Sequence, residues 1–113
     1  MLTMAGIFPK PYYAVIFISQ KNTDDPAFDR MGALVAEKVA SAKGFLGMDR
    51  HRTAGGLGFS ISYWDSLENI RAWRDETVHA AGQKTAREKW YSAYTIRTCQ
   101  VLSDSLFDKD DTL

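Results

Sequence analysis

Four apolar segments of the chain have the composition of β-strands. The first, residues 12–19, is rich in aromatic and β-branched residues on both faces, which is typical of a strand in the centre of a sheet. Residues 45–53 and 57–64 flank the tripeptide AGG, a turn of the kind that joins two strands of a hairpin. Residues 91–102 again favour β-structure. The pattern therefore predicts four strands, two of them joined in a hairpin.

Between these strands, apolar residues recur at the spacing of amphipathic helices. Polar residues 22–25 offer N-caps ahead of Pro26, and Gly44 is expected to end the helix that follows. A second helix starts at the cap-like sequence DSLE, residues 65–68, and its pattern continues beyond a break near residues 75–77. The order is β-α-β-β-α-β, the ferredoxin-like arrangement of an antiparallel sheet with both helices on one face. We therefore predict an α+β fold of this class.

The alternation of side chains along residues 57–64 separates two different faces of this strand. One face carries large apolar side chains and the other mostly small ones: Leu57, Phe59, Ile61 and Tyr63 against Gly58, Ser60, Ser62 and Trp64. An uncovered apolar sheet face has a larger apolar area than monomers usually expose to water. We therefore expect a second copy of the chain to cover this face in a homodimer. The small-residue face, if it lies under the helices, would leave room for a ligand.

The chain of 113 residues corresponds to one domain, which we place at residues 12–102, after an N-terminal extension, residues 1–11. The polar, acidic residues 103–113 are expected to form a frayed tail. Fourteen Lys and Arg balance fourteen Asp and Glu, so we expect no nucleic-acid partner, and no segment is long and apolar enough for a membrane span.

The single cysteine, Cys99, cannot form an internal disulfide, and the first residues lack the features of a signal peptide. We therefore expect a cytoplasmic protein. Because Cys99 lies in a mostly apolar strand, we expect its thiol to be buried and unreactive.

Several motifs of known chemistry are absent from the sequence. The segment AGGLG lacks the glycine spacing and the following helix of a nucleotide site, and there is no Gly-x-Ser-x-Gly elbow, HExxH motif or pair of close carboxylates. No Cys/His pattern has the spacing of a zinc site. We therefore expect no hydrolytic activity and no bound cofactor, whether metal, flavin, nucleotide or haem.

Three segments, together with the residues between the last two, closely resemble the antibiotic-biosynthesis-monooxygenase (ABM) domain family. They are FLGMDRHR, GFSISYWDSLENIRAWR and KWYSAYTIRTCQV, with His79, Gln83 and Arg87 between the second and the third. The resemblance covers about residues 12–102 and implies the dimeric α+β barrel fold. Members of this family include cofactor-independent oxygenases of anthrones and quinols and, more distantly, haem-degrading enzymes.

The haem-degrading branch is disfavoured when the chain is compared with it residue by residue. Trp73 matches the tryptophan of that branch, but Gln83 stands where the haem-ligating histidine would be. Residues 12–19 also lack the asparagine that the resemblance would require on the first strand. An amide replaces imidazole poorly on iron, although His79, one helical turn earlier, could still bind it.

The candidate catalytic residue is His79, which shares a helix face with Gln83. Its imidazole could bind a substrate phenol or accept a proton near neutral pH; the alternative is a half-buried structural histidine. Trp64 and Trp73 could form the walls around a flat aromatic substrate, although Trp73 also completes an apolar stripe and is favoured as a core residue. Candidate substrate-binding residues are Trp64, Trp73, Ser60, Ser62 and Gln83.

Two functions fit these residues. The first is a cofactor-independent monooxygenase that acts on a small aromatic or quinol substrate, which is deprotonated by His79 and itself reduces oxygen. The second is a non-catalytic dimeric module that binds a small ligand in the same pocket. Both need a cavity, and only the first needs a proton acceptor.

Overall fold

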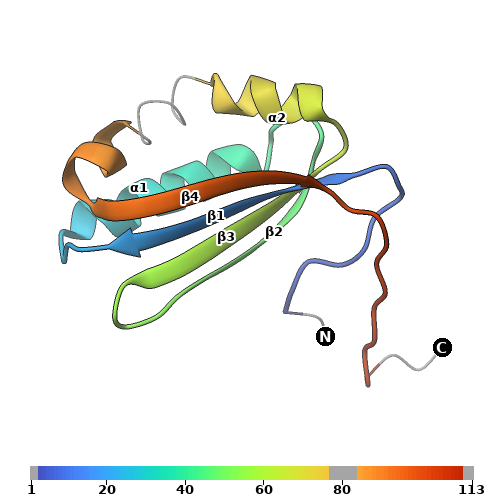
Figure 1. Ribbon diagram of the computed structural model, residues 1–113, viewed down its shortest axis with the longest axis horizontal. Helices are drawn as coiled ribbons and strands as arrows, with labels where there is room; N and C mark the ends of the chain where they lie inside the picture. Colours follow the sequence, from blue (N-terminus) through green and yellow to red (C-terminus); the bar gives the residue numbers. More distant parts are fainter. Residues whose placement is uncertain (1–2, 77–83, 111–113) are drawn as a thin grey trace.

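The computed structural model describes residues 3–76 and 84–110 of the chain (Figure 1). Its elements follow in the order β1 (Tyr13–Lys21), α1 (Pro26–Val39), β2 (Phe45–Arg52), β3 (Leu57–Trp64), α2 (Leu67–Arg74) and β4 (Tyr91–Gln100). Residues 84–89 are helical and lead directly into β4. The predicted β-α-β-β-α-β arrangement is confirmed.

The four strands form one antiparallel sheet in the order β2-β3-β1-β4. The predicted central position of the first strand is confirmed, because Tyr13 of β1 lies opposite both Trp64 of β3 and Gln100 of β4. The hairpin turn between β2 and β3 is confirmed as well, and Gly56 takes a positive φ of 96° there. The outer edges of the sheet are therefore β2 and β4.

Helices α1 and α2 lie on the same face of this sheet (Figure 1). Val39 of α1, Ile70 of α2 and Trp64 of β3 are all buried and form one apolar cluster. We call this side of the sheet the covered face and the opposite side the open face.

Helix α1 begins and ends through local hydrogen bonds. The Asp25 carboxylate accepts a bond from the Ala27 N–H, and Pro26 fits the first turn, where no donor is needed. The helix ends at Val39, so the prediction that Gly44 terminates it is wrong. Gly44, with φ of 81°, belongs to the turn into β2, where a Cβ would lie 2.3 Å from a carboxylate oxygen of Asp65. Glycine is needed there for close approach rather than for the helix end.

Helix α2 starts where the cap-like sequence predicts. The Ser66 hydroxyl accepts a hydrogen bond from the Asn69 N–H at 3.1 Å. The helix ends at Arg74 with Asp75 as its C-cap, which confirms the predicted break.

The N-terminal segment folds over one end of the open face. The Phe8 ring contacts Tyr12 and Tyr63 with centroids 5.3 and 5.7 Å apart. The Asp49 carboxylate of β2 accepts hydrogen bonds from the Ala5 N–H at 2.7 Å and from the Tyr63 hydroxyl at 3.0 Å. Burial, together with the hydrogen bond to Asp49, raises the pKa of Tyr63 to about 12.

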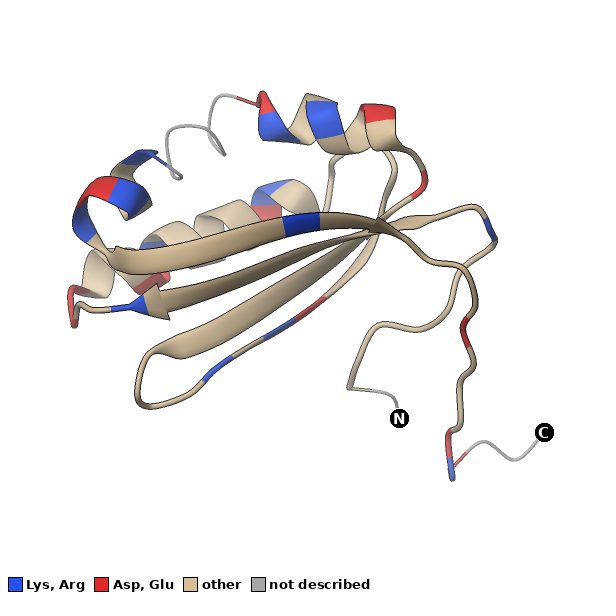
Figure 2. Ribbon diagram, viewed as in Figure 1, with Lys and Arg blue, Asp and Glu red and all other residues tan. Residues whose placement is uncertain are grey.

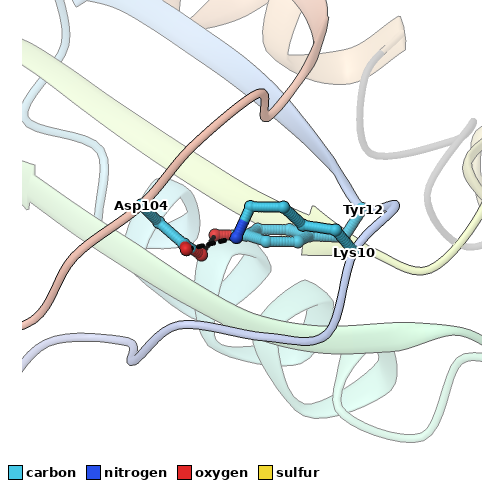
Figure 3. A network of polar contacts seen from close by, with 3 residues as sticks. All are labelled: Lys10, Tyr12 and Asp104. Carbon is cyan, nitrogen blue, oxygen red and sulfur yellow. Dashed lines mark hydrogen bonds and ion pairs between the residues drawn. The ribbon is translucent and has the colours of Figure 1, made fainter.

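The segment after β4 is tied to the segment before β1 by a charged contact (Figure 3). The Lys10 ammonium and the Tyr12 hydroxyl both donate to the carboxylate of Asp104. Burial raises the pKa of Tyr12 to about 12, with a further contribution from Asp104, while Lys10 lowers the pKa of the Asp104 carboxyl. At this position the expectation of a frayed tail is therefore wrong.

The expectation for Cys99 is also wrong, because its side chain is exposed. Cys99 lies on β4, which is an edge strand with exposed positions along most of its length. Helices long and apolar enough to cross a membrane are not found in the described part of the chain.

Candidate functional site

The small-residue side of β3 belongs to the covered face. Trp64 at its end has only 1% of its surface exposed, and its indole N–H donates to the hydroxyl of Ser62 at 2.8 Å. Ser60 and Ser62 are half-buried. Three of the predicted site residues therefore share the face that the alternation of side chains predicts.

Trp64 is enclosed by aromatic and aliphatic side chains from several elements. Its ring meets that of Phe45 edge-on with centroids 5.5 Å apart. On another side lies Trp73 of α2, whose ring is tilted by 31° at a centroid distance of 6.4 Å. Because Trp64 is buried and Trp73 is half-buried, Trp73 is the one of the two that reaches a surface.

Trp73 lines a hollow of about 290 Å³ between the C-terminal end of α1 and the helix α2. The residues around it are Lys38, Ser41, Ala42, Lys43, Asn69, Ala72, Trp73 and Glu76. Trp73, two lysines, one glutamate and several residues with hydrogen-bonding side chains therefore line one space. Such a combination suits a flat aromatic molecule with an oxygen substituent that can carry negative charge.

The two remaining predicted residues, His79 and Gln83, lie outside the described residues. The described chain stops at Glu76 on one side of them and resumes at Lys84 on the other.

The opposite end of the covered face carries a buried polar contact that the sequence did not reveal. The Arg52 guanidinium donates to the Ser19 hydroxyl at 2.7 Å, and to the carbonyl oxygens of Ser19 and Gly56 at 3.1 and 2.6 Å. Ser19 has only 1% of its surface exposed. Gly58 lies opposite Arg52, and a Cβ there would lie 2.8 Å from the guanidinium carbon. The room above Gly58, expected to receive a ligand, is filled by this arginine.

Aromatic rings surround the Arg52 side chain. Its guanidinium carbon lies 5.3 Å from the centroid of Phe28 and 5.8 Å from that of Tyr91. Burial raises the pKa of Tyr91, while the nearby charge of Arg52 acts in the opposite direction. Nearby, the Trp90 indole N–H donates to Asp25 at 3.3 Å. The feature of the sequence that could have indicated this cluster is Gly58 on β3, which lies opposite Arg52 on β2.

Within residues 3–76 and 84–110, no three His, Cys, Asp or Glu side chains lie close enough together to hold a metal ion.

The class of protein follows from the sequence comparison and agrees with the fold. Residues 11–85 match the family described as antibiotic biosynthesis monooxygenase, and the chain belongs to this family. Among individual relatives, the uncharacterized protein YqjZ of Bacillus subtilis (strain 168) is 38% identical over 100 residues, which cover 88% of each chain.

Solved structures share the same fold. A putative antibiotic biosynthesis monooxygenase from Nitrosomonas europaea matches with a TM-score of 0.72 and 15% identity, over 85% of this chain and 95% of that one. The protein Rv0793 from Mycobacterium tuberculosis matches with a TM-score of 0.74 and 14% identity, over 84% and 99%. SnoaB from Streptomyces nogalater, described as a cofactor-independent oxygenase, matches with a TM-score of 0.72 and 11% identity, over 83% and 96%. At such identities the likeness shows the fold.

Proposed function

We propose that this chain is a cofactor-independent monooxygenase that oxidises a small electron-rich aromatic substrate, such as an anthrone or a quinol, and that it acts as a homodimer. The observation that carries the proposal is the hollow in which the Trp73 indole faces the same space as Lys38 and Lys43. Membership of the family and the described activity of SnoaB support the same chemistry.

In the proposed reaction the substrate itself provides the electrons. Loss of a proton from an activated CH₂ group gives an enolate, which transfers electrons to O₂ and forms a C–O bond. The O–O bond of the resulting hydroperoxide then breaks, one oxygen atom remains as a carbonyl group, and the other leaves as water. The balance is CH₂ plus O₂ to C=O plus H₂O, so no other reductant is needed.

The protein would bind the substrate and stabilise its anion. The Trp73 ring would stack on the aromatic plane, while Trp64, held by Ser62, supports it from behind. The ammonium groups of Lys38 and Lys43 would stabilise the enolate oxygen.

The other predicted residues complete the proposal. His79 would accept the substrate proton and Gln83 would contact the substrate, whereas Ser60 does not line the hollow beside Trp73. His79 and Gln83 lie outside the described residues, so their roles follow from the sequence.

The test is oxygen-dependent turnover of a panel of anthrones and quinols, including dithranol. Trp73→Ala should raise the KM about tenfold, since an aromatic contact contributes up to about 1.5 kcal/mol. Leu67→Ala is the matched control, because Leu67 is exposed on the same helix and does not line the hollow.

His79→Ala in the same assay should lower kcat by roughly 10²-fold, the lower end of what a positioned base contributes. A small effect of His79→Ala would assign the reaction to the electrostatics of the hollow. Binding of the panel without any oxygen consumption would instead show a non-catalytic binding module.

The homodimer is proposed from the open face. Ile18, Leu57 and Phe59 lie on it with 39%, 54% and 40% of their surface exposed. Light scattering at micromolar concentration should give about twice the chain mass. A stable monomer under these conditions would contradict this part of the proposal.

A further inference from the structure

The end of the covered face beside the hairpin between β2 and β3 carries two basic side chains. Arg52 of β2 and Lys21 of β1 both lie near the ring of Phe28, with the guanidinium carbon 5.3 Å and the ammonium nitrogen 4.8 Å from its centroid. The carbonyl oxygen of Gly56 in the hairpin turn accepts hydrogen bonds from the Arg52 Nη1 at 2.6 Å and from the Lys21 backbone N–H at 2.9 Å. The fold therefore brings two positive charges to one aromatic ring.

These two charges have no carboxylate partner in the described part of the chain. Figure 2 shows acidic positions where the chain enters α1, a segment that contains Asp25. The Asp25 carboxylate caps α1 and accepts a hydrogen bond from the Trp90 indole. Within residues 3–76 and 84–110, neither Lys21 nor Arg52 forms an ion pair. The local charge at this end of the covered face is therefore positive.

The hydrogen bonds of Arg52 leave one edge of its guanidinium group without an acceptor. An arginine side chain has five N–H donors in one plane. Nη1 donates to the carbonyl oxygens of Ser19 and Gly56, and Nη2 donates to the Ser19 hydroxyl, so all three acceptors are neutral. Because Ser19 contacts both Nη1 and Nη2, it faces the edge that these two nitrogens share. The second donor of Nη2 and the Nε–H form the other edge, and no described residue accepts a bond from them.

This arrangement suits a carboxylate. Two parallel N–H groups on one edge of a guanidinium bind both oxygens of a carboxylate. A partly buried cation without a counterion costs free energy, and two neighbouring cations repel each other, so a bound anion would relieve both costs. Arg52 and Lys21 are half-buried, so a small solute can reach them. The rings of Phe28 and Tyr91 beside the guanidinium favour an anion with an apolar body.

We propose that this end of the covered face is a binding site for a small organic carboxylate, whose two oxygens bind the Nε–Nη2 edge of Arg52 and whose charge is also stabilised by Lys21. We call it the Arg52 site. Phe28 lies in the first turn of α1, whereas the hollow beside Trp73 lies at the C-terminal end of this helix. The inference is therefore independent of the proposed monooxygenase reaction and of the homodimer.

The first test is an NMR titration of the ¹⁵N-labelled protein with benzoate, followed through the Nε–H signal of Arg52. A hydrogen bond to a carboxylate should move this proton signal downfield, whereas the neutral benzamide should leave it unmoved. Arg52→Lys keeps the charge and identifies the signal by its loss. A signal that benzoate does not move would overturn the proposal, and tighter binding of inorganic phosphate than of benzoate would overturn the assignment to a carboxylate.

The second test uses two matched lysine variants. Lys21→Gln should weaken the binding of benzoate measured at Arg52 about fivefold, since one of the two cations is lost at a half-exposed position. The Lys21 side chain contacts only the Phe28 ring among the described residues, so circular dichroism should show a native fold. Lys43→Gln removes a lysine from the hollow beside Trp73 and should leave the titration of Arg52 unchanged.

The outcomes separate the Arg52 site from the proposed reaction. Equal weakening by Lys21→Gln and Lys43→Gln would show that benzoate responds to the overall charge, and would overturn the site. Failure of benzoate to bind at Arg52 while anthrones are still oxidised would overturn the Arg52 site alone.

Discussion

The two faces of the sheet are built from the same strands, but their side chains differ in how far they are buried. On the covered face even a charged group is enclosed and bonded, as Arg52 is to Ser19 and Gly56. On the open face Leu57 and Phe59 remain half exposed. The comparison indicates that the covered face contributes most of the buried contacts of one chain, while the open face leaves large apolar side chains exposed to solvent.

The largest expected effect is on the covered face. Trp64→Ala should lower the free energy of unfolding by about 3–5 kcal/mol, because it leaves a cavity next to Phe45 and Trp73. The measurement is urea denaturation at a fixed protein concentration. Leu57→Ala on the open face is the control, with an expected loss below about 1 kcal/mol in the monomer. Equal losses would mean that the two faces do not differ in this way.

A smaller effect should follow from the polar contact on the covered face. Arg52→Met keeps the length of the side chain but leaves the buried Ser19 without its donor, so we expect a loss of about 2–3 kcal/mol in urea. Arg50→Met, at an exposed position of the same strand, should stay within about 0.5 kcal/mol of the wild type. If Arg52→Met and Arg50→Met have the same free energy of unfolding, the hydrogen bonds of Arg52 do not contribute to stability.

The smallest effect concerns the end of the open face that the N-terminal segment covers. Tyr12 and Tyr63 each have a pKa raised from 10.0 to about 12, so the folded state holds their protons more tightly than the unfolded state. Their contribution to stability is complete below pH 10 and is lost as the pH rises from 10 to about 12. Thermal unfolding should therefore show a decline in this range that is shallower in Tyr12→Phe.

The variant Asp104→Asn tests how far Asp104 raises the pKa of Tyr12. The variant replaces the charged carboxylate next to Tyr12 with a neutral amide, so the pKa of Tyr12 should fall part of the way to its ordinary value while burial keeps it raised. Tyr63, bonded to Asp49, serves as the internal comparison and should change less, because Tyr12 makes only the smallest contribution to its raised pKa. Ultraviolet absorbance of tyrosinate follows both groups, and an unchanged Tyr12 would show that Asp104 has no influence.

The element order and the division of the faces could be predicted because they depend on local patterns. Alternation along β3 places Ser62 and Trp64 on one side and Phe59 on the other, and this parity holds in the sheet. The pattern could not show that Arg52 turns inward, since a long polar side chain is usually assigned to solvent.

Contacts between segments that are distant in the sequence could not be predicted either. A mostly apolar strand predicts a buried Cys99, but the strand order makes β4 an edge and the side chain is exposed. Asp104 looked like part of an acidic tail, and its partners Lys10 and Tyr12 lie at the other end of the sequence. For the candidate site, the sequence indicated Trp73, whereas Lys38 in the last turn of α1 and Lys43 in the turn after it could be found only from the structure.

The position of β1 in the middle of the sheet has a consequence for how the chain folds during its synthesis. Tyr13, among the first residues of the domain to leave the ribosome, pairs with Gln100, among the last. Until β4 emerges, one side of this apolar strand has no hydrogen-bonding neighbour in the sheet, and pairing over so long a separation is slow to form. The nascent chain therefore exposes one unpaired edge of β1 until residues 91–100 have emerged, and an edge of this kind favours pairing with other chains.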